Sequence, residues 1–262
     1  MRVLVTNDDG VRAPGIAPLA AAVVAAGHDV VVAAPQEDMS GSSAAIGRMH
    51  VDETIDVEEV ELPEVDAPCF GVLGPPALAV MAARLGGFGD PPGVVVSGIN
   101  PGPNTGRAVL HSGTVGAART AANFGVSGLA VSIGVGDPYR WETAAELAVA
   151  ALAWLVEQPP KTVLNLNVPN LRRDELRGVR EASLAPFGTV RAALVESQGG
   201  GLQMELAEHG VELPADSDTT LVRSGCAALT SLVGVRAVEG PVVAGAVAAV
   251  EAVLADPEAR TA

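Results

Sequence analysis

The chain opens with a short apolar segment, Arg2–Thr6, that runs directly into Asn7, two adjacent aspartates and Gly10. β-Branched and aliphatic residues dominate this segment, which predicts a buried strand. Because neighbouring side chains of a strand point to opposite faces, Asp8 and Asp9 can serve one site only where the strand ends and the backbone turns. Gly10 permits such a turn. Two adjacent carboxylates repel each other unless a cation lies between them, and the alternative is a loop with two solvated aspartates.

The residues that follow predict a strand–helix–strand unit. Pro14 is placed to begin a helix that runs to about Ala26, and Gly27 is placed to end it. Residues Asp29–Ala34 then form a second apolar run that is typical of a buried strand. A strand, a helix and a strand in this order imply a parallel sheet. The chain has 262 residues, 48% hydrophobic and only 3% aromatic, which suits one large α/β domain with a core of Val, Ala and Leu.

Further segments continue this pattern and predict a doubly wound α/β core over residues 1–170, with helices on both faces of a parallel sheet. The expected helices lie at 75–85, 115–123 and 141–157, and the expected strands at 93–97, 129–133 and 162–168. Residues 171–262 predict a C-terminal oligomerisation arm, with a β-hairpin around Gly199–Gly201, and a terminal helix over Pro241–Ala255, both integrated with the core in a single domain. This arm has too few apolar positions for a core of its own, so we expect it to pack on another subunit.

Polar residues follow three of the predicted strands. Asp8 and Asp9 follow the first strand, Ser40 lies in the loop after the second, and Asn100 follows the strand at 93–97. The carboxyl ends of parallel strands meet at one edge of a sheet, where ligands bind. Two carboxylates, a hydroxyl and an amide oxygen suit Mg²⁺, Mn²⁺ or Ca²⁺ better than zinc. We therefore predict one divalent metal ion per subunit on these four residues, phosphoester chemistry, and Asp8 and Asp9 as catalytic residues.

A second candidate site feature is the predicted helix start at Ser112, Gly113 and Thr114. Free N–H groups at a helix N-terminus bind phosphate well, although Ser112 or Thr114 at this position can also be a helix cap and nothing else. A small phosphorylated substrate is the expected partner. The other candidate substrate-binding residues lie in the strand-end loops and are Asn7, Gly41, Ser42 and Asn104.

Charge and cysteine content limit the remaining classes of function. The formal net charge of −15 argues against binding to a nucleic-acid duplex or an anionic membrane. The two cysteines form no CxxC motif, which fits a reducing compartment. A strand begins almost at the first residue, no signal peptide is recognised, and no apolar run is long enough to span a membrane. We expect a cytoplasmic protein.

Four sequence blocks, in order along nearly the whole chain, resemble the survival protein SurE family of 5'/3'-nucleotidases. The blocks are VTNDDG, SGSS, VVVSGINPGPNTG with the downstream HSGTV, and LNLNVPN, and DSDTTLVRSGCAALTSL is a weaker fifth match. The resemblance implies a metal-dependent phosphatase that releases phosphate from nucleoside monophosphates. It implies the metal ligands Asp8, Asp9, Ser40 and Asn100. It also implies a Rossmann-like core and a swapped C-terminal arm in a homodimer or homotetramer.

The chain departs from the family pattern at three places. Gly74–Ala79 stands where Gly-Thr-Pro-Ala-Asp-Cys is usual, Arg107 and Ala108 stand where acidic residues are usual, and Met39 replaces a basic or polar residue. These departures leave open a specialised phosphatase that acts on another small phosphorylated metabolite, or a catalytically silent nucleotide-binding homologue. A glycosyltransferase-like enzyme with paired aspartates is a further alternative, which the other strand-end loops do not support.

Overall fold

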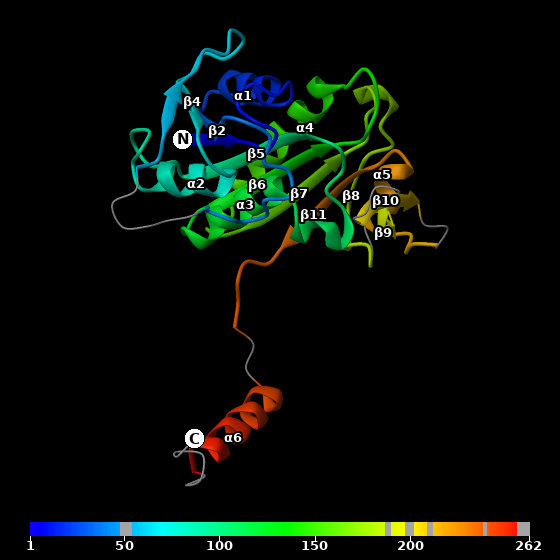
Figure 1. Ribbon diagram of the computed structural model, residues 1–262. Helices are drawn as coiled ribbons and strands as arrows, with labels where there is room; N and C mark the ends of the chain where they lie inside the picture. The colour runs from blue at the N-terminus through cyan, green and yellow to red at the C-terminus, as the bar shows by residue number, and fades with distance from the viewer. Residues whose placement is uncertain (48–53, 187–189, 197–201, 209–211, 238–239, 256–262) are drawn as a thin grey trace.

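A nine-stranded mixed sheet organises the chain (Figure 1). The structure is a computed structural model, and it describes residues 1–47, 54–186, 190–196, 202–208, 212–237 and 240–255. In their order across the sheet, the strands are β3 (Val57–Glu59), β4 (Cys69–Val72), β2 (Asp29–Pro35), β1 (Arg2–Thr6), β5 (Val94–Pro101), β6 (Ser127–Ile133), β7 (Val163–Val168), β11 (Ala227–Leu232) and β8 (Val179–Glu181).

The six strands from β4 to β7 are parallel, as the strand–helix–strand pattern predicts. β1 lies between β2 and β5, and Val5 pairs with Val32 on one side and Val96 on the other. The carboxyl ends of these three strands therefore meet at one edge of the sheet. This register brings the loops after them, with most of the candidate site residues, into the same region.

Two layers of helices cover the sheet (Figure 1). α1 (Ile16–Ala25) and α4 (Trp141–Leu155) pack on one face, and α2 (Pro76–Arg84) and α3 (Gly113–Asn123) pack on the other. Alternate residues of β1 serve the two layers, since Val3 and Val5 belong to one core and Leu4 to the other. The expected α/β fold, with helices on both faces of the sheet, is confirmed.

The start of α1 differs from the sequence prediction. The helix begins at Ile16 with Gly15 as its N-cap, so Pro14 lies outside it and Pro18 occupies the first turn. A Cβ atom on Gly15 would lie only 2.1 Å from the carbonyl oxygen of Ile99, so glycine allows the helix start to approach β5 closely. Gly27, with a φ of +85°, follows the helix as predicted.

The C-terminal third contributes two strands to the main sheet, whereas the sequence predicts integration with the core but neither of these strands. β11 pairs antiparallel with β7, and β8 pairs parallel with β11. A separate hairpin is formed by β9 (Val190–Glu196) and β10 (Leu202–Glu208), around the expected turn, which lies outside the described residues. α6 (Pro241–Ala255) has the expected bounds. Strands from beyond residue 170 complete the sheet. The division of the chain into a core over 1–170 and an arm over 171–262 therefore stays a prediction.

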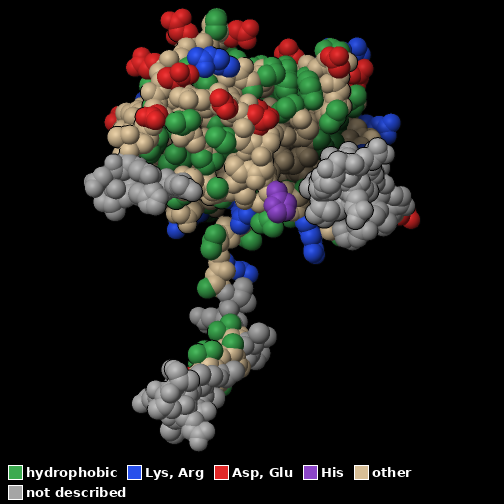
Figure 2. Space-filling view, in the orientation of Figure 1, with side chains coloured by type: hydrophobic (Ala, Val, Ile, Leu, Met, Phe, Trp, Pro, Cys, Tyr) green, Lys and Arg blue, Asp and Glu red, His purple; other side chains and the backbone are tan. Residues whose placement is uncertain are grey.

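The surface carries many acidic side chains, as the net charge of −15 predicts. Figure 2 shows acidic side chains gathered mainly on the upper half of the molecule, near α1 and β4 in the orientation of Figure 1. Within the described ranges, no helix combines the length and the apolar character needed to cross a membrane.

Close packing between α3 and the sheet can be tested at Gly128 in β6. A Cβ atom there would lie 2.2 Å from the backbone oxygen of Ala118, so Gly128→Ala forces the helix and the strand apart. We expect the free energy of unfolding, measured by urea denaturation, to fall by about 1–3 kcal/mol. Gly234→Ala is the control, because a Cβ at Gly234 meets nothing within 4 Å. Equal stability of the two variants would contradict this packing.

Candidate active site

The turn after β1 is closed by the side chain of Asn7. Its amide nitrogen donates to the carbonyl oxygen of Gly10 at 3.0 Å, and its amide oxygen accepts from the Gly10 N–H at 3.2 Å. Gly10 has a φ of +110°, which few other residues adopt. Asn7 is fully buried, so both polar groups of its side chain serve the turn. The turn presents Asp8 and Asp9 at the end of the strand, and substrate binding by Asn7 stays a prediction that this geometry does not support.

The N-terminus of α3 holds the carboxylate of Asp8. The Gly113 N–H donates to Asp8 Oδ2 at 3.0 Å, and the Thr114 hydroxyl donates to Asp8 Oδ1. Burial raises the pKa of Asp8, and the hydrogen bonds from Thr114 and Gly113 oppose that rise. Ser112 accepts from the Val115 N–H at 3.1 Å and so acts as the helix cap. The anion at this helix start is therefore Asp8, which the positive end of the helix dipole stabilises.

Asp9 carries a buried oxygen that lacks a hydrogen-bond partner among the described residues. Burial, followed by the charges of Asp8 and Asp38, raises the pKa of Asp9 from 3.8 to about 7. Such an oxygen requires either a proton or a cation. This unpartnered carboxylate oxygen is the strongest indication in the structure of a cation site.

The loop after β2 brings Ser40 to the same edge. The Met39 N–H donates to the carbonyl oxygen of Asp8 at 2.7 Å, which fixes this loop against the β1 turn. Asp38 Oδ1 accepts from the Ser40 N–H at 2.8 Å and from its hydroxyl at 2.6 Å. Because the hydroxyl proton is directed to Asp38, the lone pairs of the Ser40 oxygen remain available to a cation.

Asn100 lies near the end of β5 and approaches Asp8 through Thr114. Its amide nitrogen donates to the carbonyl oxygen of Gly102 at 2.6 Å, which fixes the amide orientation. Its amide oxygen lies 3.4 Å from the Thr114 hydroxyl oxygen, whose closer partner is Asp8. Asn100 therefore keeps an available acceptor oxygen beside the Asp8 carboxylate.

These four residues fit a hard divalent cation. Each supplies an oxygen, and the buried oxygen of Asp9 has no other partner within the described chain. The part of the chain that the structure describes contains no group of three or more His, Cys, Asp or Glu side chains arranged to hold a metal. A metal here would need the neutral oxygens of Ser40 and Asn100 beside the two carboxylates, which suits Mg²⁺ or Mn²⁺.

Among the other candidate residues, Ser42 lies within the site. A Cβ atom on Gly113 would lie 2.6 Å from the Asp8 Cβ and 2.7 Å from the Ser42 hydroxyl oxygen, so the three residues converge. The Ser42 hydroxyl is buried and has no partner among the described residues. Gly41 is exposed in the same loop, with a φ of +82°. Substrate binding by Gly41 and Ser42 stays a prediction.

Asn104, by contrast, is engaged in the fold. Its side-chain nitrogen donates to the Ser132 hydroxyl at 2.8 Å, and its carbonyl oxygen accepts from Asn165 and Asn167. Its role in substrate binding stays a prediction, as do those of Ser112 and Gly113, whose groups cap α3 and hold Asp8.

Asp38 is a site residue to which sequence reasoning assigned no role. It holds Ser40 and raises the pKa of Asp9. Its position two residues before a candidate metal ligand was the available signal, because an aspartate often binds the backbone N–H two residues later.

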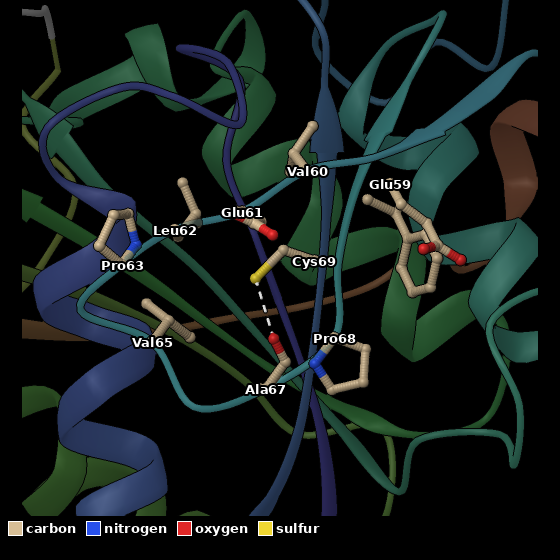
Figure 3. A pocket seen from close by; sticks show the side chains of 10 residues that line it. Glu59, Val60, Glu61, Leu62, Pro63, Val65, Ala67, Pro68 and Cys69 are labelled. Atoms are coloured by element: carbon tan, nitrogen blue, oxygen red, sulfur yellow. Dashed lines mark hydrogen bonds between the residues drawn. The ribbon is translucent and has the colours of Figure 1, made fainter.

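A pocket elsewhere in the structure contains none of the candidate site residues. It has a volume of about 650 Å³ beside the β3–β4 hairpin, and its lining residues run from Glu59 to Phe70. Figure 3 shows the Cys69 thiol within it, where Sγ lies 3.3 Å from the carbonyl oxygen of Ala67.

Comparison with known proteins decides the family. The model of the family described as "Survival protein SurE" matches residues 3–191. The chain belongs to the SurE family. A relative named 5'-nucleotidase SurE from Xanthomonas campestris pv. campestris (strain B100) is 42% identical over 182 residues, which cover 68% of this chain and 67% of that protein. The protein of the same name from Xylella fastidiosa (strain M12) is 40% identical over 192 residues, covering 70% of each.

A solved SurE structure supports the fold as well as the family. The SurE protein from Aquifex aeolicus superposes with a TM-score of 0.78 at 27% identity, covering 96% of this chain and all of that chain. The SurE match therefore extends from the sequence to the arrangement of the elements.

The raised pKa of Asp9 predicts a pH-dependent stability in the metal-free protein. A carboxyl with a raised folded-state pKa stabilises the fold below its unfolded value of 3.8, and that stability is lost as pH rises through about 7. In EDTA at pH 8, Asp9→Asn should therefore raise Tm by at least ~2–4 °C, the shift that about 1 kcal/mol produces in a domain of this size. The gain should shrink at pH 5.

Differential scanning fluorimetry checks this prediction, with Asp90→Asn as the control because Asp90 is exposed. Added Mn²⁺ should reverse the order by stabilising the original protein more than the Asp9 variant. A variant that is less stable than the original protein at pH 8 in EDTA would contradict the electrostatic assignment.

Proposed function

We propose that this protein is a divalent-metal-dependent phosphomonoester hydrolase, a 5'/3'-nucleotidase that releases phosphate from nucleoside monophosphates. The observation that carries the proposal is the buried, unpartnered oxygen of Asp9, whose carboxyl lies close enough to Asp8 for the charge of Asp8 to raise its pKa. The Asn100 amide oxygen and Asp8 both lie beside the Thr114 hydroxyl. The names of the relatives, 5'-nucleotidase SurE, support the substrate class.

In this proposal, Asp8, Asp9, Ser40 and Asn100 would hold one Mg²⁺ or Mn²⁺ ion per subunit. A bound divalent ion supplies a Lewis acid that polarises the phosphoryl group and lowers the pKa of water. Asp38 orients Ser40 for this role by accepting its hydroxyl proton. The α3 N-terminus keeps Asp8 in one position, which reduces the rearrangement needed when the ligand set assembles.

The remaining residues of the site would act on the substrate. The buried hydroxyl of Ser42 is a donor without a protein partner in the described chain, and it would donate to a phosphoryl oxygen. Asp9, ionised when it binds the metal, would also position the attacking water as a hydrogen-bond acceptor. Both residues lie where the loops after β1 and β2 meet.

A second candidate function is a phosphatase for a different small phosphorylated metabolite. Leu78 occupies the position where the family pattern usually has aspartate, and it is buried in the core that α2 shares with the sheet. Arg107 is exposed on η1 (Gly106–Leu110), directly after the Asn100 loop. An apolar residue and a cation at these positions favour a changed substrate pocket around an unchanged metal site.

A phosphate-release panel tests both functions. We expect hydrolysis of nucleoside monophosphates or of another phosphomonoester that requires added Mn²⁺ or Mg²⁺. Asp8→Asn should lower kcat/KM by more than about 100-fold, since changes to residues behind a metal ligand alone typically cost 10–100-fold. Asp90→Asn is the matched control. Turnover near the original level for Asp8→Asn at saturating Mn²⁺ would refute the site, and no release from any substrate would favour the silent homologue.

We further propose a homodimer or homotetramer in the cytoplasm, with no nucleic-acid or membrane partner. Three valines of α6, Val243, Val247 and Val250, are 52%, 50% and 64% exposed and lie on one side of the helix. Figure 1 shows α6 apart from the sheet. A second copy of the chain would cover this apolar stripe. The net charge of −15 and the free cysteines Cys69 and Cys226 support the other parts of the proposal.

A charge on the apolar side of α6 tests the assembly. Val247→Asp should weaken association and shift the mass measured by light scattering at micromolar concentration toward the monomer. Ala248→Asp introduces the same charge on another side of the exposed helix and should have less effect. A monomeric original protein, or equal masses for the two variants, would contradict the proposed role of the stripe.

A further inference from the structure

The loop over residues 102–105 connects the end of β5, which carries the proposed ligand Asn100, to η1, and three distant side chains fix the far end of this loop. Asn165 and Asn167 donate to the carbonyl oxygen of Asn104 at 2.9 and 3.0 Å. Asp218 Oδ2 accepts from the Gly106 N–H at 2.8 Å. All three side chains are fully buried. A loop rich in Gly, Pro and Asn is thus held by contacts that span 61, 63 and 112 residues of sequence.

The two asparagines belong to one face of β7. Residues two apart on a strand point the same way, which lets both amides reach a single carbonyl oxygen. That oxygen is only an acceptor, so each asparagine must present its nitrogen, and both of their amide oxygens remain buried without partners among the described residues. The arrangement stabilises the loop at the expense of two unsatisfied acceptors. Apolar side chains at these two positions of β7 would stabilise the sheet without leaving buried acceptors unpaired, so the asparagines serve the loop.

Asp218 connects this loop to two other segments. Its Oδ1 accepts from the backbone N–H groups of Ala185 and Thr219 at 3.0 and 2.7 Å, while its Oδ2 accepts from Gly106. Donors that approach both oxygens require acceptors on both sides, which a carboxylate provides. An asparagine would place an N–H group opposite one of these N–H groups. Aspartate at position 218 therefore accepts all three hydrogen bonds, whereas asparagine would accept on one side only.

We propose that Asp218, assisted by Asn165 and Asn167, is a positioning residue for the metal site. It holds Gly106 and so fixes the loop over residues 102–105, whose Gly102 carbonyl oxygen accepts from the Asn100 amide nitrogen and sets the orientation of the Asn100 amide beside Asp8. The inference rests on the metal-dependent function proposed above. The inference gives residues 164–167 (LNLN) and 216–220 (DSDTT) a common role in holding the loop beside the metal site, although these segments contribute none of the proposed metal ligands.

The experiment measures Mn²⁺ binding directly, from the electron paramagnetic resonance signal of free Mn²⁺ during titration of the full-length protein. Asp218→Asn should weaken binding by about 10–100-fold, as changes behind metal ligands typically do. The Mn²⁺ concentration needed for half-maximal turnover should rise by the same factor, while kcat at saturating Mn²⁺ changes less.

Two control variants separate positioning from stability. Ser217→Ala removes the N-cap of the helix that Asp218 begins, α5 (Asp218–Arg223), without touching Gly106. Asp216→Asn makes the same chemical change at an exposed position two residues away. Ser217→Ala should lower Tm with less than a twofold change in Mn²⁺ affinity, and Asp216→Asn should change neither. A Ser217→Ala variant that weakens Mn²⁺ binding as much as Asp218→Asn would overturn the proposal.

A second variant keeps the test decisive if Asp218→Asn fails to fold. Asn167→Ala leaves Asn104 with one donor, and it should weaken Mn²⁺ binding severalfold in a folded protein. Unchanged Mn²⁺ affinity in every folded variant of Asp218 and Asn167 would overturn the positioning role alone. Failure of the original protein to bind Mn²⁺ would overturn the proposed function itself, and the inference with it.

Discussion

The pairing of a buried carboxylate with a helix N-terminus is the interaction on which the rest of this site depends. Asp8 is desolvated at the end of β1, and the first residues of α3 supply hydrogen bonds and a favourable dipole. Because Gly113 contacts Asp8 so closely, even a Cβ atom at that position would collide with it. The α3 helix is therefore fixed relative to β1 by chemistry at the site as well as by packing against the sheet.

Because of this interaction, the α3 N-terminus has few free N–H groups with which to bind a phosphate directly. Gly113 and Thr114 direct their donors to Asp8, and Val115 and Gly116 donate to Ser112. The helix start thus acts on an anionic substrate only indirectly, by holding the carboxylate that would bind the metal. The attraction that overcomes the negative charge of the protein would come from the cation.

The sequence predicts the fold where local patterns determine it. Apolar runs and glycine breaks predict β1, β2 and the helices between the parallel strands, and strand ends predict which polar loops meet. The antiparallel insertion of β11 beside β7 could not be predicted, because pairing partners far apart in sequence leave no local signal. Asp218 was missed for the same reason, since its contact with Gly106 spans 112 residues. The sequence predicts a helix start at Pro14, which is too early, because Gly15 as the actual N-cap gives a weaker signal than proline.

The position of β11 in the sheet also affects how the chain can fold during synthesis. When residues up to 170 have left the ribosome, β7 is the last strand available, and one of its edges has no partner until Ala227–Leu232 emerges. Exposed edges of this kind can pair with other chains. The alternating asparagines of β7 make that transient edge more polar than a continuous run of valine and leucine. The asparagines that hold the Asn104 loop thus also make the nascent sheet less prone to pair with other chains.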